Sequence, residues 1–244
     1  MINGSPKVLI CIPAFNEAER LPETLTTLKR VVGSAWTIAV FDDGSRDETA
    51  NVAKSMGVQV VRLPLHLGYG ATIQTGYKFA LRSGYDFLVQ FDADGQHEPA
   101  SIERILGPLI AGEADWVVGN RFHPGCSYVS PTLRRIGQAL FRTICRMMTG
   151  LNVTDPTSGF KGLNRAALKF LSEDYFPLDY PDADVFIMMH TNGFRCKEVD
   201  VIMYPPKTGQ SMHAGIIGPI HYVIKMFLSI FMGLLRRERR KNGR

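Results

Sequence analysis

The first half of the chain alternates short apolar runs with segments whose apolar residues repeat at helical spacing. The apolar runs predict buried strands over 8–12, 37–41, 58–62, 87–91 and 116–118. The segments between and after them predict helices over 19–32, 47–56, 71–83 and from Pro99 onwards. Because parallel strands need crossover connections, this alternation predicts an α/β fold with a mostly parallel, doubly wound sheet.

The second half of the chain has a less regular pattern. Helices are expected over 132–149 and 182–193, and a strand is expected over 197–203. Two stretches that contain Gly and Pro, 151–162 and 205–215, are expected to be loops. The sequence contains neither an internal repeat nor a low-complexity segment.

Polar clusters follow three of the predicted strands at the points where those strands end. They occupy residues 13–17, 42–47 and 92–97. In doubly wound sheets, ligands bind in the crevice beyond the carboxyl ends of the strands. We therefore expect the three clusters to converge on one crevice, although they lie far apart in the sequence.

The third cluster carries two carboxylates one residue apart, Asp92 and Asp94. Two buried carboxylates are costly unless something neutralises them, and a divalent cation does so. Mg²⁺ or Mn²⁺ bound there also binds diphosphate oxygens, and Gln96 or His97 is a candidate for a further ligand or phosphate contact. The alternative is a solvated turn with two free acids, which the apolar strand before it disfavours.

The first two clusters supply hydrogen-bonding groups. Asp42 and Asp43 end a strand, and one of their carboxylates is expected to accept from a nucleobase N–H or a ribose hydroxyl. Pro13 turns the chain so that Asn16 and Glu17 face the crevice, where Glu17 is expected to bind ribose. A turn that binds no ligand would explain the presence of Asn16 equally well.

The segment His66–Gly70 contains two glycines and gives a flexible backbone near a phosphate or a base. It is neither a P-loop nor a GxGxxG motif followed by an acid. An NTPase or a dehydrogenase is therefore disfavoured.

Composition and cysteine usage exclude several classes of protein. The chain has 244 residues, 45% hydrophobic and 21% charged, and is far too apolar for a disordered chain. Its four cysteines form no CxxC pair, which disfavours a zinc ribbon or a disulfide framework. The first residues do not resemble a secretory leader, so a cytoplasmic protein with reduced thiols is expected.

The net charge of +5 resides in the last nine residues, which carry six Lys or Arg and one Glu. They follow a nearly continuous apolar run over 216–235, which Pro219, His221 and Lys225 make too polar for a full membrane span. We expect residues 213–244 to form an amphipathic helix at a membrane surface, with the basic tail on anionic lipid. A core helix or an oligomer contact is the alternative. A cationic tail, unlike a cationic folded face, disfavours nucleic acid.

Six segments together resemble family 2 glycosyltransferases of the nucleotide-diphospho-sugar (GT-A) fold. They are Ile12–Glu17, Asp42–Thr49, Leu67–Ala71, Asp92–Pro99, Gly119–Phe122 and Ser158–Lys161. They occur in the family's order, and such an ordered set is far more specific than any single motif. The resemblance is strongest to dolichol-phosphate mannose synthases and bacterial polyprenyl-phosphate glycosyltransferases. It implies a GT-A domain over 1–212, with a nucleotide-binding half over 7–122 and an acceptor half over 123–212.

The resemblance also implies roles for individual residues. Those expected to hold the nucleotide are Pro13, Asn16, Glu17, Asp42, Asp43, Gly68, Gly70 and Asp92. Those expected to hold Mg²⁺ or Mn²⁺ are Asp92, Asp94 and Gln96. Arg121 is expected to meet a phosphate of the donor or the acceptor, for which a planar guanidinium is well suited.

The second half matches the family less closely. Asp182 occupies the position of the family's general base for hydroxyl acceptors, although Pro181 replaces the usual Glu. A helix N-terminus stabilised by acids is the alternative. Lys207 replaces the more common Arg of a loop that meets phosphate. Arg134 or Arg135 is a further candidate for an acceptor phosphate, and a solvated helix face is the alternative for both.

The activity implied is inverting transfer of a sugar from a UDP- or GDP-linked donor to dolichyl or undecaprenyl phosphate at the membrane surface. An acceptor phosphate is already ionised and needs no strong base. The second candidate, a hydroxyl of a cell-envelope saccharide or glycolipid, requires Asp182 as base. A third candidate is a non-catalytic protein that binds nucleic acid or a partner through its tail, and the intact acidic clusters disfavour it. Any membrane protein partner is expected to be a separate chain.

Overall fold

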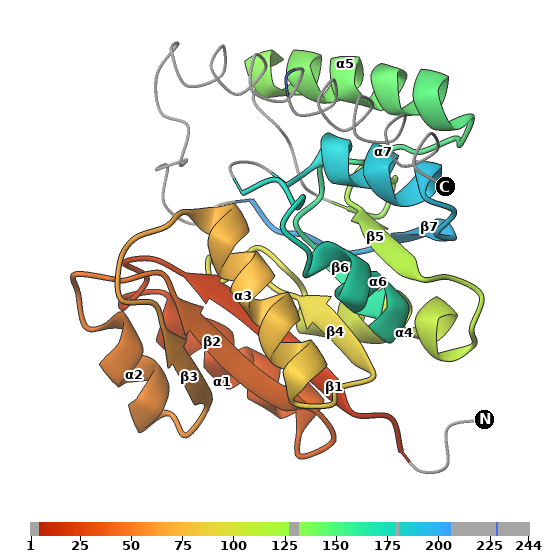
Figure 1. The fold of residues 1–244 in the computed structure, drawn as a ribbon. Coiled ribbons are helices and arrows are strands. Elements are labelled where there is room, and N and C mark those ends of the chain that lie inside the picture. The colour runs from red at the N-terminus through yellow and green to blue at the C-terminus, as the bar shows by residue number, and fades with distance from the viewer. Residues whose placement is uncertain (1–4, 127–131, 179–180, 206–227, 229–244) are drawn as a thin grey trace.

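The computed structural model describes residues 5–126, 132–178, 181–205 and 228. These residues form a seven-stranded sheet with helices on both faces (Figure 1). The strands are β1 (Val8–Ala14), β2 (Thr37–Asp42), β3 (Gln59–Arg62), β4 (Phe87–Gln90), β5 (Trp116–Asn120), β6 (Lys161–Asn164) and β7 (Cys196–Asp200). The helices are α1 (Leu21–Val32), α2 (Thr49–Ser55), α3 (Tyr69–Arg82), α4 (Ile102–Ile110), α5 (Thr132–Thr149), α6 (Arg165–Leu171) and α7 (Ala183–Thr191), with a 3₁₀ turn, η1, over Pro99–Ser101.

The strands lie in the order β3-β2-β1-β4-β6-β5-β7. Each neighbouring pair is parallel except the two that involve β6, which runs antiparallel to β4 and to β5. All seven residues of β1 are buried, which explains its continuous apolar run: a central strand covered on both faces has no polar side.

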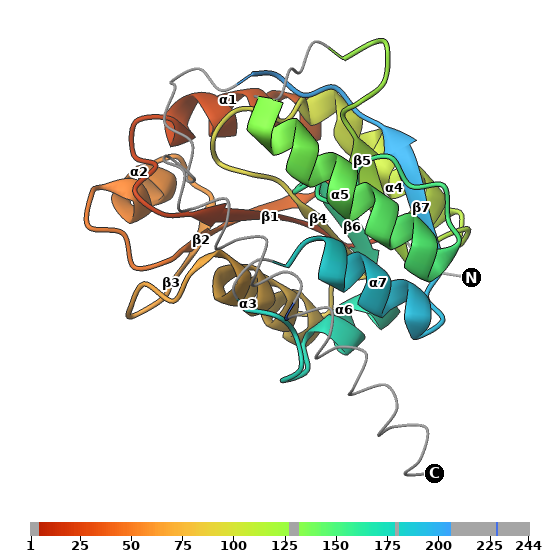
Figure 2. The ribbon, with the colours of Figure 1, turned by 90° about the horizontal axis from the view of Figure 1, so that it is seen from above.

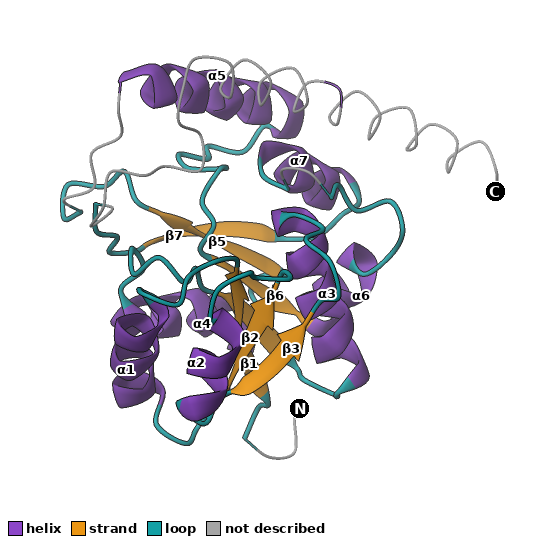
Figure 3. Cartoon of the chain, turned by 90° about the vertical axis from the view of Figure 1, so that its left-hand side faces the viewer, coloured by secondary structure: helices purple, strands orange, loops and turns teal. Residues whose placement is uncertain are grey.

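Two hydrophobic cores fill the space between the sheet and its helices. Leu21, Leu25 and Leu28 of α1 are fully buried, and α2 and α4 join α1 over one face of the sheet (Figure 2). Apolar residues of α3, α6 and α7 pack on the opposite face. The long helix α5 contributes Phe141 and Cys145 to this second core and lies beside α7, at the end of the molecule where β5 and β7 lie (Figure 3).

The predicted mostly parallel α/β sheet is confirmed, and the predicted helix over 132–149 coincides with α5. The expected loop over 151–162 is confirmed as far as residue 160, but its last two residues belong to β6, and the prediction did not include α6. The predicted strand over 197–203 is the shorter β7. The predicted nucleotide-binding half (7–122) and acceptor half (123–212) contribute strands to the same sheet. Strand β6 of the second half lies between β4 and β5 of the first half.

The predictions for the end of the chain fall largely outside the described residues. They concern Lys207, the loop over 205–215, the apolar run over 216–235 and the amphipathic helix over 213–244. Among the described helices, none combines the length and the apolar character needed to cross a bilayer.

Candidate active site

The loops after β1, β2 and β4 meet at one edge of the sheet. The Asp43 N–H donates to the Ala14 carbonyl oxygen over 2.9 Å, which joins the loops after β1 and β2. Thr24 of α1 donates its hydroxyl to the Ala93 carbonyl oxygen over 2.9 Å and ties the loop after β4 to the same edge. The predicted convergence of the three polar clusters is therefore confirmed.

Asn16 joins two of these loops through its own backbone and side chain. Its N–H donates to Ser45 Oγ, and its Oδ1 accepts from the Arg46 N–H, both over 2.9 Å. Its φ of 54° is in the left-handed region, which asparagine tolerates better than most residues. These contacts favour the structural account of Asn16 over a ligand contact. The predicted turn at Pro13 is wrong, because β1 continues through this residue to Ala14 and Pro13 lies opposite Phe41 of β2.

Asp42 and Asp43 are buried, and all of their carboxylate oxygens except Asp42 Oδ2 accept a hydrogen bond within the described residues. Asp42 accepts from the Ser45 N–H over 2.9 Å and pairs with the Arg62 guanidinium at 3.2 Å. Asp43 accepts from the N–H groups of Leu67 and Gly68 over 2.8 and 2.9 Å. The expected contact of one of them with a base or ribose stays a prediction. Asp43 holds the loop before α3, and Asp42 holds the turn after β2 and Arg62 at the end of β3.

The loop that Asp43 holds needs both of its glycines. Gly68 has a φ of +94°, a conformation that side-chain-bearing residues rarely adopt. A Cβ on Gly70 would lie 2.3 Å from the Leu178 carbonyl oxygen, so the backbone before residue 179 packs directly on this glycine. The two positions are thus explained by packing and backbone geometry, and their expected contact with the nucleotide stays a prediction.

Glu17 stands at the rim of the same edge. It pairs with Arg20 at 3.1 Å, and its N–H donates to Thr49 Oγ1 over 2.8 Å. Burial raises the pKa of Glu17, while Arg20 opposes the rise and Asp94 adds to it. The expected contact of Glu17 with ribose stays a prediction.

Asp92 follows β4, and its two carboxylate oxygens have different surroundings. Tyr69 donates its hydroxyl to Asp92 Oδ1 over 3.0 Å. Asp92 Oδ2 lies 3.5 Å from His97 Nε2 without a hydrogen bond between them. A Cβ on Gly159 would lie only 2.7 Å from the same oxygen, so the lack of a side chain at residue 159 leaves that side of it open. Burial raises the pKa of Asp92, and the charges of Lys161 and Arg121 oppose the rise.

Asp94 is held by the residue two positions later. The Gln96 N–H donates to Asp94 Oδ1 over 3.0 Å, and the Gln96 side-chain amide donates to Oδ2. Burial and the neighbouring Asp92 raise the pKa of Asp94. Gln96 thus donates to Asp94 through both its backbone N–H and its side-chain amide. Its role as a metal ligand stays a prediction.

His97 is buried beneath the loop, and the interpretation of this residue as a phosphate contact is wrong. Its ring stacks on Phe160 at 4.5 Å between centroids and meets Phe91 edge-on at 5.2 Å. Burial lowers the pKa of His97 to about 4, so the imidazole is neutral at pH 7. Nδ1 accepts from the Asp92 N–H over 3.2 Å, which leaves the proton on Nε2. His97 therefore supports the backbone of Asp92 from below.

Arg121, expected at a phosphate, is buried at the end of β5 and paired with Asp155. Its Nε and one terminal nitrogen donate to the two Asp155 oxygens over 2.7 and 3.0 Å, and the same terminal nitrogen also reaches the Thr157 carbonyl oxygen at 3.2 Å. A bidentate pair of this kind fixes the guanidinium in place. The pair ties the loop after residue 153 to the site, while contact of Arg121 with a phosphate stays a prediction.

A buried lysine partners Asp182. Lys161 of β6 donates to the Pro181 carbonyl oxygen over 2.8 Å, and its Nζ lies 3.6 Å from Asp182 Oδ1. Asp182 also raises the pKa of Asp92, which places it near the paired acids. The sequence contained no signal for Lys161 as a charge partner, because its segment is polar and rich in glycine and reads as a loop.

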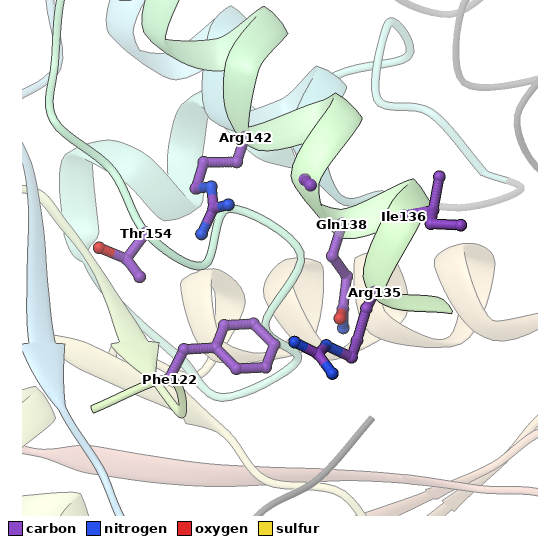
Figure 4. Close-up of a pocket in the computed structure, with 7 residues that line it drawn as sticks. Phe122, Arg135, Ile136, Gln138, Arg142 and Thr154 are labelled. Atoms are coloured by element: carbon purple, nitrogen blue, oxygen red, sulfur yellow. The ribbon is translucent and has the colours of Figure 1, made fainter. Parts of the chain in front are cut away.

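A pocket of about 560 Å³ opens between α5 and the loop after β5. Its lining includes two arginines, Arg135 and Arg142, and the ring of Phe122 (Figure 4). Both polar atoms of the Gln138 side chain are buried there and make no hydrogen bond within the described part of the chain. The predicted candidate Arg135 thus lines a pocket, whereas the side chain of Arg134 is not among those described.

The family model for glycosyl transferase family 2 matches residues 9–171 of the chain. The chain belongs to glycosyltransferase family 2. The undecaprenyl-phosphate mannosyltransferase of Micrococcus luteus is 33% identical to it over 221 residues, 87% of this chain and 90% of that protein. The UDP-N-acetylglucosamine–dolichyl-phosphate N-acetylglucosaminyltransferase of Methanococcus voltae is 28% identical over 213 residues, 80% of this chain and 84% of that protein.

The fold of this family 2 glycosyltransferase is also found among solved structures. Glucosyl-3-phosphoglycerate synthase from Mycobacterium tuberculosis, crystallised with Mn²⁺, UDP-glucose and phosphoglyceric acid, superposes with a TM-score of 0.71 at 18% identity. The match covers 93% of this chain and 79% of that one. The expected GT-A fold is thereby confirmed.

Proposed function

We propose that this glycosyltransferase moves a sugar from a nucleotide-diphosphate sugar to a polyprenyl phosphate at a membrane surface, with Asp92 and Asp94 holding Mg²⁺ or Mn²⁺. Its main structural support is the side of Asp92 that Gly159 leaves open, at the edge where the loops after three strands meet. The two relatives named above are a mannosyltransferase and an N-acetylglucosaminyltransferase, but each is named for a polyprenyl phosphate. The acceptor class is therefore better supported than the donor.

The residues present fit a divalent cation that is completed by substrate. Carboxylate oxygens are the ligands that Mg²⁺ and Mn²⁺ prefer, and Mg²⁺ is commonly held by one or two carboxylates together with substrate phosphates. Among the described residues, no group of three or more His, Cys, Asp or Glu side chains could hold a metal ion. A cation at Asp92 and Asp94 would thus take its other ligands from water and the diphosphate.

The chain's own residues supply position and charge. When bound, the cation offsets the charge that develops on the departing nucleoside diphosphate. Asp43 and Gly68 shape the loop beside the nucleotide, and Lys161 neutralises Asp182 near the transferred sugar. Because the acceptor phosphate is ionised near pH 7, attack on the anomeric carbon from the opposite face needs no proton removal.

The pocket beneath α5 fits the head of an anionic lipid acceptor. Two guanidinium groups favour a phosphate, and the ring of Phe122 with the apolar part of Ile136 favours the first isoprene units. The Gln138 amide supplies buried donors in the same space. Figure 4 shows Arg135 and Arg142 reaching into this space from α5.

The direct test is an assay of UDP- and GDP-linked sugars with undecaprenyl and dolichyl phosphate, in the presence and absence of Mn²⁺. We expect metal-dependent transfer from one nucleotide class to a polyprenyl phosphate. Calorimetry with the same donors separates binding from transfer. Failure of every nucleotide sugar to bind in a metal-dependent way would favour a non-catalytic binding protein.

Replacing Arg135 and Arg142 by glutamine is expected to lower kcat/KM for polyprenyl phosphate about 10- to 100-fold. Hydrogen bonds to charged groups contribute roughly 1.5–3 kcal/mol, and glutamine removes the charge while leaving a shorter polar side chain. Binding of the nucleotide sugar should change less than about twofold, because the pocket lies apart from the paired acids. Arg82→Gln, at the exposed end of α3, is the matched control. A defect confined to donor binding would contradict this assignment.

Replacing Asp182 by asparagine distinguishes the two acceptor classes. With polyprenyl phosphate, Asp182→Asn is expected to keep turnover within a few-fold of the original, since no base is needed and asparagine still accepts from Lys161. A general base contributes roughly 10²–10⁴-fold, so near-total loss of turnover would instead indicate a hydroxyl acceptor. Steady-state rates with both acceptor types decide between them.

A further inference from the structure

A chain of hydrogen bonds runs from the second hydrophobic core to the carboxylate of Asp92. Tyr77 Oη lies 3.1 Å from Gln90 Oε1, and Gln90 Nε2 lies 2.8 Å from Tyr69 Oη. Tyr69 Oη in turn lies 3.0 Å from Asp92 Oδ1. Tyr77 and Gln90 are buried. The chain therefore links α3, which carries both tyrosines, to the end of β4.

These hydrogen bonds run in one direction. An ionised carboxylate only accepts, so Tyr69 gives its one hydroxyl proton to Asp92. The Tyr69 oxygen then accepts from the Gln90 amide nitrogen, which turns the Gln90 oxygen towards the Tyr77 hydroxyl. Turning any one of these groups would break a buried hydrogen bond, and an unpaired buried polar group is costly.

The two oxygens of Asp92 are thus in different situations. Oδ1 is occupied by Tyr69, whereas Oδ2 lies in the space that Gly159 leaves open. The terminal torsion of an aspartate is intrinsically broad, so without a fixed donor the carboxylate could rotate and exchange the two oxygens. His97 supports the backbone of Asp92, and its Nε2 lies 3.5 Å from Asp92 Oδ2 but makes no hydrogen bond that would fix this torsion.

We propose that Tyr69, oriented by Gln90 and Tyr77, is a positioning residue that turns Asp92 Oδ2 towards the cation and the diphosphate. This inference rests on the proposed function, because it assigns Tyr69 to the same metal site. Tyr69 escaped prediction because the segment around it was interpreted only as flexible backbone.

Tyr69→Phe tests the inference by removing one hydroxyl and keeping the ring. Titration of Mn²⁺ followed by electron paramagnetic resonance, with UDP and then with GDP present, measures the affinity of the site. Loss of a group that orients a metal ligand typically costs 10- to 100-fold in affinity, so we expect Mn²⁺ binding at least about tenfold weaker. Tyr175→Phe is the matched control, because its hydroxyl donates to the Phe170 carbonyl oxygen at the end of α6.

Gln90→Glu tests the direction of the chain with Tyr69 in place. When ionised, a carboxylate at residue 90 accepts the Tyr69 proton and thereby takes the donor away from Asp92, although the shape of the side chain is nearly unchanged. Burial favours the protonated acid, which donates to Tyr69 as glutamine does, so Mn²⁺ binding is measured at the upper end of the pH range in which the chain is folded. We expect a loss of Mn²⁺ affinity similar to that of Tyr69→Phe. A purely packing role for Tyr69 predicts instead that both variants bind Mn²⁺ normally once folded, as circular dichroism and thermal unfolding would report.

The outcomes separate the two proposals. If the unaltered chain shows no Mn²⁺-dependent binding of UDP or GDP, the proposed function fails. If it binds and Tyr69→Phe binds within twofold of it, the positioning role is overturned while the function stands. If Tyr69→Phe does not fold, Gln90→Glu decides the question. Tyr77→Phe is a third test: it frees the Gln90 amide to turn, and we expect it to lower the Mn²⁺ affinity by a few-fold.

Discussion

Asp92→Asn is expected to lower sugar transfer about a hundredfold or more. A bound cation contributes several kcal/mol of charge stabilisation in such reactions, and each 1.4 kcal/mol corresponds to about a factor of ten in rate. Asparagine keeps the shape of the side chain and can still accept from Tyr69, so the loss isolates the negative charge. Initial rates over a Mn²⁺ titration measure the effect, and excess metal should restore little of it.

The same substitution is expected to leave the protein as stable as before or more stable. Burial raises the pKa of Asp92, which means that the folded chain disfavours its charged form. This cost is present at neutral pH and disappears in acid, where the group is protonated in both the folded and the unfolded chain. The Tm of Asp92→Asn should therefore equal or exceed that of the unaltered protein near pH 7, and the difference should vanish in acid.

Asp174→Asn is the matched control for Asp92→Asn, because it removes the same charge from an exposed position. It should change neither activity nor Tm. An Asp92→Asn variant that loses activity only in proportion to a large fall in Tm would contradict a metal-binding role and indicate a structural one.

Gly159→Ala is expected to weaken Mn²⁺ binding and sugar transfer about 10- to 100-fold with little change in Tm. The added Cβ would lie 2.7 Å from Asp92 Oδ2, closer than atoms of this kind approach, so the carboxylate must turn away. A side chain can turn at modest cost, whereas a metal site tolerates misplaced ligands poorly. Calorimetry of Mn²⁺ with a nucleoside diphosphate, together with thermal unfolding, measures the two effects separately.

Gly107→Ala serves as the control for Gly159→Ala. A Cβ at Gly107 meets nothing within 4 Å, and alanine favours the helix α4 in which it lies. This variant should keep full activity with equal or higher Tm. Normal Mn²⁺ affinity in Gly159→Ala would show that Oδ2 of Asp92 does not face the ligand.

The central strands β1, β2, β4 and β5 could be predicted because their burial appears directly as apolar runs. The antiparallel strand β6 could not, because its sequence KGLN is mostly polar or small. Gly162 is required there because a Cβ would lie 2.4 Å from Ile105 of α4, and Lys161 is buried because Pro181 and Asp182 partner it. Neither cause is visible in a local pattern, since both partners are distant in sequence.

In the candidate site, too, some features are visible in the local sequence pattern and others depend on residues that are distant in sequence. The acids at the ends of β2 and β4 were recognisable because carboxylates after apolar strands need partners. Which partner each acid has depends on distant segments: Asp43 is occupied by the loop around residue 67, while Asp92 meets Tyr69 and Gly159. Sequence reasoning could thus find the acids but could not separate Asp43, whose oxygens the chain's own donors occupy, from Asp92, whose Oδ2 has open space on the Gly159 side.

The position of β6 also limits how this enzyme can be engineered. Its residues pair with β4 through four register positions and with β5 through three, so the chain segment after residue 123 completes the middle of a sheet begun by the segment before it. A segment transplanted from a relative in place of the residues after 123 would have to restore the pairing of β6 with both β4 and β5. It would also have to restore the buried contacts of Lys161. Changes of acceptor preference are therefore better sought by altering side chains around α5 than by exchanging modules.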